Sequence, residues 1–375
     1  MKDMKFLRHR KPTDILLFAI PLAIMASLLN WGETYVFGLS AIAIIPLAGY
    51  IGEATEVLAA YTGPRIGGLL NATLGNAAEL IISIVAIREG LLDLVKASIA
   101  GSIIGNVLLV LGMSMLLGGT KNGIQYFDRR RAGNNAILLV LAVIALVIPS
   151  VLSSSIGPRE SIEVEALSIG VAVVMIVLFI LGLLYSFKMD GGPLTARSSV
   201  EVHPEEERQN AKEFDKAHHH SSWSTRKSLL VLGLATAGVA YMSELLIGSV
   251  EPVVASLGIS EFFVGIILIP IVGNVAEHLV AVKVAIQNEM DLSVEIVNAS
   301  SLQIALFVAP VLVFVSLIMG NPMKLIFHEV ELLAIGVGIL IAALVSSDGE
   351  SNWLEGAELL AVYLILALAF FLLPM

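Results

Sequence analysis

Long apolar segments, separated by short polar or glycine-containing turns, make up most of the chain. A helix that crosses a bilayer needs about 20 mostly apolar residues, and eleven segments approach or exceed that length. We therefore predict an all-α polytopic membrane protein with about 11 transmembrane helices. The predicted spans are Asp14–Trp31, Thr34–Tyr61, Pro64–Ile87, Leu91–Leu117, Gly133–Leu152, Glu163–Phe187, Lys227–Val250, Leu257–Ile286, Met290–Met319, His328–Val345 and Leu354–Leu373.

Two segments in different parts of the chain share a polar motif. Gly75–Glu79 reads Gly-Asn-Ala-Ala-Glu, and Gly273–Glu277, 198 residues later, reads Gly-Asn-Val-Ala-Glu. The same offset pairs Ser102 with Ser300, so the similarity extends beyond the motif. The repeat unit is five predicted helices long, and because five is odd the two halves lie in opposite orientations in the bilayer. Inverted repeats of this kind are typical of secondary transporters, whose substrate site lies at the interface of the two repeats near the midplane.

The repeat divides the chain into four parts. We predict a basic leader with an extra N-terminal transmembrane helix (1–32), a first five-helix repeat (33–187), an acidic linker (188–226) and a second five-helix repeat (227–375). Most Lys and Arg residues fall on one side of this arrangement, which predicts a cytoplasmic N-terminus and a cytoplasmic linker. The linker also contains His218, His219 and His220. A solvated linker and a metal-sensing segment both remain open for it.

Composition agrees with a membrane protein and excludes several other classes. Of the 375 residues, 57% are hydrophobic and 14% are charged, whereas a soluble domain carries about 45–50% apolar and about 25% charged residues. This bias argues against a soluble enzyme and against a disordered protein. The net charge of −10 also argues against nucleic-acid binding. The absence of cysteine from the sequence excludes disulfides, thiolate metal sites and cysteine nucleophiles.

The glutamates of the two motifs, Glu79 and Glu277, lie deep inside apolar segments. A carboxylate at that depth costs several kcal/mol unless it is paired, protonated or ligated. The neighbouring glycines, and Pro270 before the second motif, loosen a helix and free carbonyl oxygens. Carboxylates, amides and carbonyls are the oxygen ligands that calcium prefers. The sequence therefore predicts that Glu79 and Glu277 are the metal ligands of a transported cation.

The same two carboxylates suit exchange against protons. When no cation is bound they repel one another and retain a proton, and a divalent cation displaces it, so that their titrations are coupled. Further protons would need other acids or a histidine. The candidates for a proton pathway are Glu53, Glu56, Glu244 and His278, which directly follows Glu277. A structural role for each of these four side chains stays open.

Polar residues near the motifs complete the predicted binding site. Hydroxyls and amides also join neighbouring helices in membranes, but their position beside a paired acidic motif favours a coordination shell. The predicted cation- and proton-binding residues besides Glu79 and Glu277 are Asn76, Asn274, Ser102, Asn106, Asn298, Ser300 and Gln303.

The two Gly-Asn-x-x-Glu motifs resemble the paired signature motifs of the CAX-type calcium/proton (cation/proton) antiporters, which belong to the calcium/cation antiporter superfamily. Gly101–Asn106 and Ser300–Phe307 are similar to the second motif pair of that family. The resemblance implies shared calcium and proton binding by Glu79 and Glu277. Ala78 departs from it, since many relatives carry Thr there.

We therefore expect a secondary active antiporter that exchanges calcium for protons by alternating access, and not an enzyme. A sodium/calcium exchanger of the same superfamily and a passive cation channel are the alternatives. The segment His328–Leu332 lacks the second histidine of a zinc HExxH motif. No cofactor is expected, because calcium and protons are substrates, and the lipid bilayer is the other partner. The expected location is the plasma membrane of a prokaryote or a vacuolar-type membrane of a eukaryote, and homo-oligomerisation stays open.

Overall fold

The computed structural model describes residues 12–62, 64–158, 161–188 and 223–373, and almost all of them are helical. The helix bounds follow the apolar segments of the sequence. Most of the predicted linker, including its three consecutive histidines, lies outside the described residues. The elements up to residue 188 are η2 (Pro12–Phe18), α1 (Ala19–Leu28), α2 (Glu33–Thr62), α3 (Pro64–Leu74), α4 (Ala77–Arg88), α5 (Leu92–Ile104), η3 (Gly105–Val110), α6 (Leu111–Asn122), β1 (Gln125–Tyr126), α7 (Arg129–Ile156) and α8 (Ile162–Lys188).

The second half runs from α10 onward. Its elements are α10 (Thr225–Gly248), α11 (Val250–Leu257), α12 (Glu261–Phe263), η4 (Val264–Leu268), α13 (Ile269–Ile286), α14 (Met290–Gln303), η5 (Ile304–Val308), α15 (Ala309–Ile318), α16 (Glu329–Val345), β2 (Glu350–Ser351) and α17 (Trp353–Leu372). The strands β1 and β2 pair antiparallel and join the two halves at one end of the molecule.

The repeat seen in the sequence is also present in the backbone. After α5 and after α14 the helix widens into a π-helical segment, η3 and η5 respectively. The offset of 198 residues maps 304–308 onto 106–110, so η5 falls within the counterpart of η3. π-Helical segments are rare and often mark functional sites. Their occurrence at matching positions supports the internal duplication. It also places an irregularity in the span that follows each motif helix.

Among the described residues, eight helices are long and apolar enough to cross a membrane, and α3 with α4 adds a ninth if this bent pair is one span. The segment Thr13–Leu28 is apolar but shorter, and α16 has 17 residues. The predicted polytopic helical class agrees with these helices. The predicted count of eleven spans is not confirmed within the described residues.

The first motif helix is broken, whereas the second is not. The helices α3 and α4 meet at Gly75 and Asn76 with a bend of 44°. In the second half α13 runs without a break through Gly273 and Asn274, and the irregular segment η4 precedes it. The expected loosening at both motifs therefore occurs at the motif in the first half and upstream of the motif in the second.

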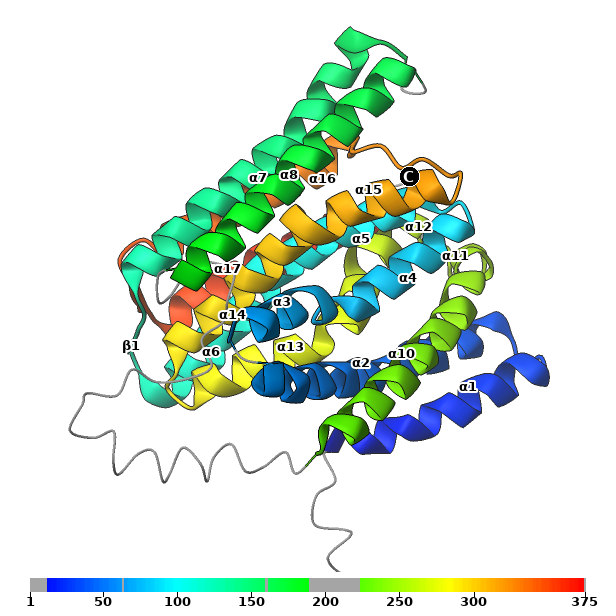
Figure 1. Ribbon diagram of the computed structural model, residues 1–375, viewed down its shortest axis with the longest axis horizontal. Helices are drawn as coiled ribbons and strands as arrows, with labels where there is room; N and C mark the ends of the chain where they lie inside the picture. Colours follow the sequence, from blue (N-terminus) through cyan, green and yellow to red (C-terminus); the bar gives the residue numbers. More distant parts are fainter. Residues whose placement is uncertain (1–11, 63, 159–160, 189–222, 374–375) are drawn as a thin grey trace, which may run out of the picture.

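The helices that follow the motif helices lie at the centre of the molecule. In the apolar 18-residue stretch within Leu92–Asn122, 83% of the residues are buried; the share is 67% in Met290–Ile318 and 28% in Ile162–Tyr185. Figure 1 shows α7 and α8 paired along one edge, and α1, α2 and α10 grouped at the opposite edge. The motif helices α4 and α13 lie between these two groups. The more peripheral helices expose many large apolar side chains, for example Ile137 and Leu181, as expected for surfaces that face lipid.

Each motif helix is capped by an asparagine of the opposite half. Asn122 donates from Nδ2 to the carbonyls of Ala285 and Ile286 at the end of α13, at 3.3 and 3.2 Å. Asn321 donates from Nδ2 to the carbonyl of Ile87 near the end of α4, at 3.0 Å. Because the last carbonyls of a helix lack intrahelical partners, these contacts fix each motif helix to the other half.

Candidate functional site

The two motifs meet at the centre of the molecule, and each glutamate lies against the glycine of the other motif. A Cβ added at Gly273 would lie 3.0 Å from Oε1 of Glu79, and one added at Gly75 would lie 3.4 Å from Oε1 of Glu277. The contact is reciprocal, as expected for inverted repeats. The structure thus brings Glu79 and Glu277 to one site, to which both halves contribute.

These contacts give the two glycines a role that the sequence did not reveal. From the sequence, Gly75 and Gly273 were expected only to loosen their helices. In the structure the missing side chain of each glycine leaves room for a carboxylate that arrives from the opposite half. A close approach of this kind is a common reason for glycine. The signal in the sequence was the fixed spacing of glycine and glutamate within both motifs.

Four oxygen atoms at this site have no hydrogen-bond partner within the described residues. They are the buried atoms Oε2 of Glu79, Oε2 of Glu277, Oδ1 of Asn76 and Oδ1 of Asn274. A buried acceptor without a partner costs about 1–3 kcal/mol, so such groups require a ligand, a proton or water. Two carboxylate and two amide oxygens form a donor set that fits a hard cation. In the part of the chain that the structure covers, no group of three or more His, Cys, Asp or Glu residues could hold a metal ion.

The side-chain nitrogens of both motif asparagines are engaged by polar residues on the central helices. Nδ2 of Asn76 donates to Oε1 of Gln303 at 2.6 Å. Nδ2 of Asn274 donates to Oγ of Ser102 at 3.1 Å and to the carbonyl of Pro270 at 3.1 Å. Ser102 and Gln303 therefore hold the asparagines in place, and the Oδ1 atoms of both amides stay available.

A second set of hydrogen bonds surrounds Glu277 alone. Ser300 lies close enough to Glu277 for its hydroxyl to act on that carboxylate, and Nδ2 of Asn106 donates to Oγ of Ser300 at 3.0 Å. His278 contacts Oδ1 of Asn106 through Nε2 at 3.1 Å. The residue that corresponds to His278 in the first half is Leu80, so this chain of contacts has no counterpart around Glu79.

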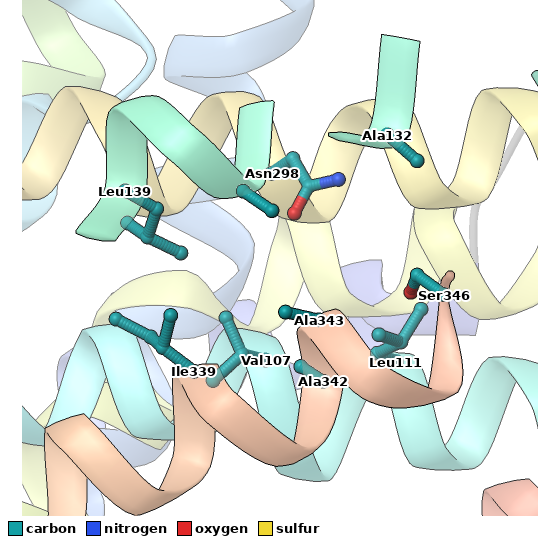
Figure 2. Close-up of a pocket in the computed structure, with 10 residues that line it drawn as sticks. Val107, Leu111, Ala132, Leu139, Asn298, Ile339, Ala342, Ala343 and Ser346 are labelled. Carbon is teal, nitrogen blue, oxygen red and sulfur yellow. The ribbon is translucent and has the colours of Figure 1, made fainter. Parts of the chain in front are cut away.

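Asn298 lies apart from the cluster. Its side chain enters a cavity of about 20 Å³ between α7, η3, α14 and α16, which Val107, Leu139 and Ser346 also line (Figure 2). Two residues along an α-helix correspond to about 200° of rotation, so Asn298 and Ser300 point to nearly opposite sides of α14. The structure does not bring Asn298 to the glutamates, and the periodicity of a helix already indicated this.

The remaining proton-pathway candidates differ in their surroundings. Glu244 is about half exposed and forms an ion pair with Arg88 at 3.0 Å, which joins α10 to α4. Glu53 on α2 is partly exposed, and Glu56 on the same helix is exposed. Glu56 lies close enough for its charge to act on Glu277, which is itself partly exposed, whereas Glu79 is only 7% exposed. Glu56 and Glu277 thus mark the more open side of the site.

The chain is similar to several known proteins. A model of the family described as sodium/calcium exchanger protein matches residues 33–188 and 227–372. A Ca²⁺/H⁺ antiporter of Aphanothece halophytica is 45% identical, covering 96% of both chains. The Ca²⁺/H⁺ antiporter ChaA of Bacillus subtilis is 43% identical and covers 94% of this chain and 97% of its own. The solved structure of native YfkE has a TM-score of 0.81 and 41% identity, and covers 96% of this chain and 100% of that chain.

Proposed function

Because this chain belongs to the sodium/calcium exchanger protein family, in the CAX-type branch that its motifs predicted, we propose that it exchanges calcium for protons across a membrane. It is then a multi-pass secondary active transporter and not an enzyme. The observation that carries the proposal is the meeting of Glu79 and Glu277, one from each half, with four oxygen atoms that lack a partner among the described residues.

Calcium binds between the two carboxylates and the amide oxygens of Asn76 and Asn274. These groups supply part of the six to eight oxygens that calcium takes, and water or backbone carbonyls complete the shell. The amides are already oriented, because Gln303 and Ser102 hold their nitrogens. Such preorganisation lowers the entropy that binding would otherwise cost.

Protons and calcium compete for the same oxygens. Two carboxylates that face each other at a buried site cannot both remain charged without a counter-ion. One calcium ion brings two positive charges, and two protons neutralise the same pair. The site is therefore occupied by one cargo or the other, and a gradient of protons drives calcium in the opposite direction.

The two halves alternate in exposing this site. Because inverted repeats rock against each other around a central site in transporters of this architecture, the partly exposed Glu277 represents the side that is open here. Glu56 lies on that side and attracts the cation toward Glu277. With the N-terminus in the cytoplasm, as the distribution of Lys and Arg predicts, this side faces the cytoplasm, since Glu56 lies near the end of α2.

Reconstitution tests the proposal directly. Proteoliposomes that carry an imposed proton gradient should take up calcium, and a protonophore should stop the uptake. Glu79→Gln and Glu277→Gln should each abolish exchange, because each removes a carboxylate that both cargoes need. Glu163→Gln, which neutralises an exposed glutamate on α8, is the matched control and should exchange at the wild-type rate.

Three results would contradict the mechanism. Exchange at the wild-type rate by either single glutamine variant would show that the carboxylates do not share the cargo. Uptake that follows a sodium gradient and ignores the proton gradient would instead make the protein a sodium/calcium exchanger. Uptake that needs neither gradient would indicate a channel.

A further inference from the structure

The position of α14 matters for the proposed site, because this helix carries Ser300 and Gln303. Gln303 accepts the hydrogen bond of Asn76, and Ser300 lies between Asn106 and Glu277. Both are buried, at 6% and 4% exposed. A shift of α14 along its axis would therefore move Gln303 away from Asn76 and Ser300 away from Glu277 at the same time.

The first turns of α14 are attached to the opposite half by Arg131. Nη1 of Arg131 lies 3.3 Å from Oε2 of Glu295 and 3.5 Å from Oδ2 of Asp291. The backbone N–H of Asp128 also donates to Oδ1 of Asp291 at 2.8 Å. Arg131 is on α7 in the first half and the two acids are on α14 in the second, so the attachment joins the two repeats.

The pair of Arg131 with Glu295 is buried, which distinguishes it from a surface ion pair. Glu295 is 4% exposed, and the side chain of Arg131 is 16% exposed. Exposed pairs contribute little, whereas removal of one partner of a buried pair leaves an uncompensated charge. The guanidinium reaches two carboxylates one helical turn apart, which defines both the rotation and the height of α14.

Packing beyond this point leaves the position of α14 less constrained. Asn298, one turn after Glu295, faces the cavity that α7 and α16 line with Leu139 and Ser346 (Figure 2). Side chains that border a void lose van der Waals contacts on that side. The ion pair of Glu295 with Arg131 is therefore a firm contact of α14 with α7 five residues before Ser300.

The corresponding part of the first half makes different contacts. Asp93, which corresponds to Asp291, forms an ion pair with Lys96 on its own helix at 2.6 Å. Lys96 contacts the other half through the carbonyl of Ile326, at 3.0 Å. The central helix α14 is thus held through two of its acids by an arginine of the opposite repeat, whereas Lys96 of α5 reaches the opposite repeat through a backbone carbonyl.

We propose that Arg131 is a positioning residue of the transport site, and that its contacts with Asp291 and Glu295 set the height of Ser300 and Gln303 and thereby the affinity for calcium. This inference rests on the proposed function, because it assumes that calcium binds between Glu79 and Glu277. The role is mechanical: Arg131 does not touch the cation.

The test compares neutral variants in proteoliposomes and in detergent. The double variant Arg131→Gln with Glu295→Gln leaves no unpaired buried charge at this pair and should raise the calcium concentration for half-maximal exchange roughly fivefold to tenfold. The maximal rate should change less. Glu295→Gln alone removes the contact with Glu295 but keeps the contact of Arg131 with the half-exposed Asp291, and should raise the same concentration. Arg130→Gln, at an exposed neighbour on the same helix turn, is the matched control.

Calcium binding measured by titration calorimetry in detergent should weaken by the same factor. A purely structural role would lower the melting temperature and leave half-maximal calcium unchanged, and that result would overturn the inference. Arg131→Lys keeps the charge on a shorter side chain that lacks the guanidinium group, and should give an intermediate value even if the neutral variants fold poorly. If Arg131→Lys has the same half-maximal calcium concentration as Arg130→Gln while Glu79→Gln is inactive, the inference about Arg131 fails and the proposed function stands. If Glu79→Gln exchanges at the wild-type rate, the proposed function itself fails.

Discussion

The two motif helices have the same Gly-Asn pair but different backbones. In the first half α3 ends and α4 begins at Gly75 and Asn76. In the second half Pro270 lies four residues before Asn274, and the corresponding first-half residue is Ala72. Proline cannot donate a backbone hydrogen bond, which leaves the carbonyl of Ile266 without its helical donor. That carbonyl lies against Gly101 of α5, and the irregularity therefore appears as η4, upstream of the motif.

This difference makes the two glutamates unequal ligands. Glu79 is the third residue of α4, so it lies where free backbone N–H groups and the helix dipole stabilise a negative charge. Glu277 is in the middle of α13 and depends on side chains such as Ser300 instead. The five-residue motif is thus nearly the same in both halves, but its two carboxylates have different surroundings. Glu79 is supported by a helix terminus, and Glu277 is supported by hydroxyl and amide groups.

The largest effect should come from filling the two glycine positions. Gly75→Ala places a Cβ 2.6 Å from the carbonyl of Asn71, so the backbone at the break must move, whereas Gly273→Ala meets only the movable Glu79 carboxylate at 3.0 Å. Overpacking of this kind costs about 1–3 kcal/mol. Exchange in proteoliposomes should therefore fall on the order of 100-fold for Gly75→Ala and about tenfold for Gly273→Ala.

Gly336→Ala is the control for these two variants, because a Cβ there has no atom within 4 Å. Equal losses for Gly75→Ala and Gly273→Ala would mean that the break at the first motif imposes no special constraint. Activity of Gly273→Ala at the control level would remove the reciprocal contact from the mechanism.

A smaller contrast should separate the residues that hold the two asparagines. Gln303→Ala removes the oxygen that accepts the hydrogen bond from Nδ2 of Asn76. The buried amide nitrogen of Asn76 then loses this partner. Ser102→Ala removes one acceptor of Asn274, whose nitrogen still reaches the carbonyl of Pro270. Because a buried unpaired donor costs about 1–3 kcal/mol, half-maximal calcium should rise about tenfold for Gln303→Ala and about twofold for Ser102→Ala. The reverse order, measured by calcium uptake rates, would contradict the assigned asymmetry.

The smallest effect is expected at the asparagine caps. Asn321→Ala removes the side-chain donor at Ile87, whereas Asn122→Ala leaves Lys121 and Gln125 still bound to the same end of α13. Asn321→Ala should lower the melting temperature in detergent by about 2–4 °C, and Asn122→Ala by less. Equal shifts in a thermal-unfolding assay would show that the extra donors at α13 add nothing.

Periodicity and motif spacing predicted much of this molecule. The apolar segments gave the helices, and the offset of 198 residues identified the pair Glu79 and Glu277, which the structure brings to one site. Ser102 and Gln303 were predicted because they are polar residues close to the motifs, and both contact motif asparagines. These features depend on local composition and on one repeat length.

The features that the sequence missed depend on contacts between distant segments. The contact of Asn106 with His278 joins a first-half residue to one without a repeat partner, so the offset could not find it. The pairing of Arg131 with Glu295 was missed for the same reason, because Glu295 corresponds to Ala97. Asn298 was assigned to the site by proximity in sequence alone, although its rotation around α14 places it in a separate cavity.

The reciprocal contact between glycine and glutamate makes the motif self-complementary. Gly75 accommodates Glu277 and Gly273 accommodates Glu79, so a single motif contains both the carboxylate and the space for an identical carboxylate. Two copies related by a twofold axis would form the same contact twice, which is the defining property of an isologous interface. One five-helix unit thus already encodes, in five residues, the surface on which an antiparallel second copy completes the site.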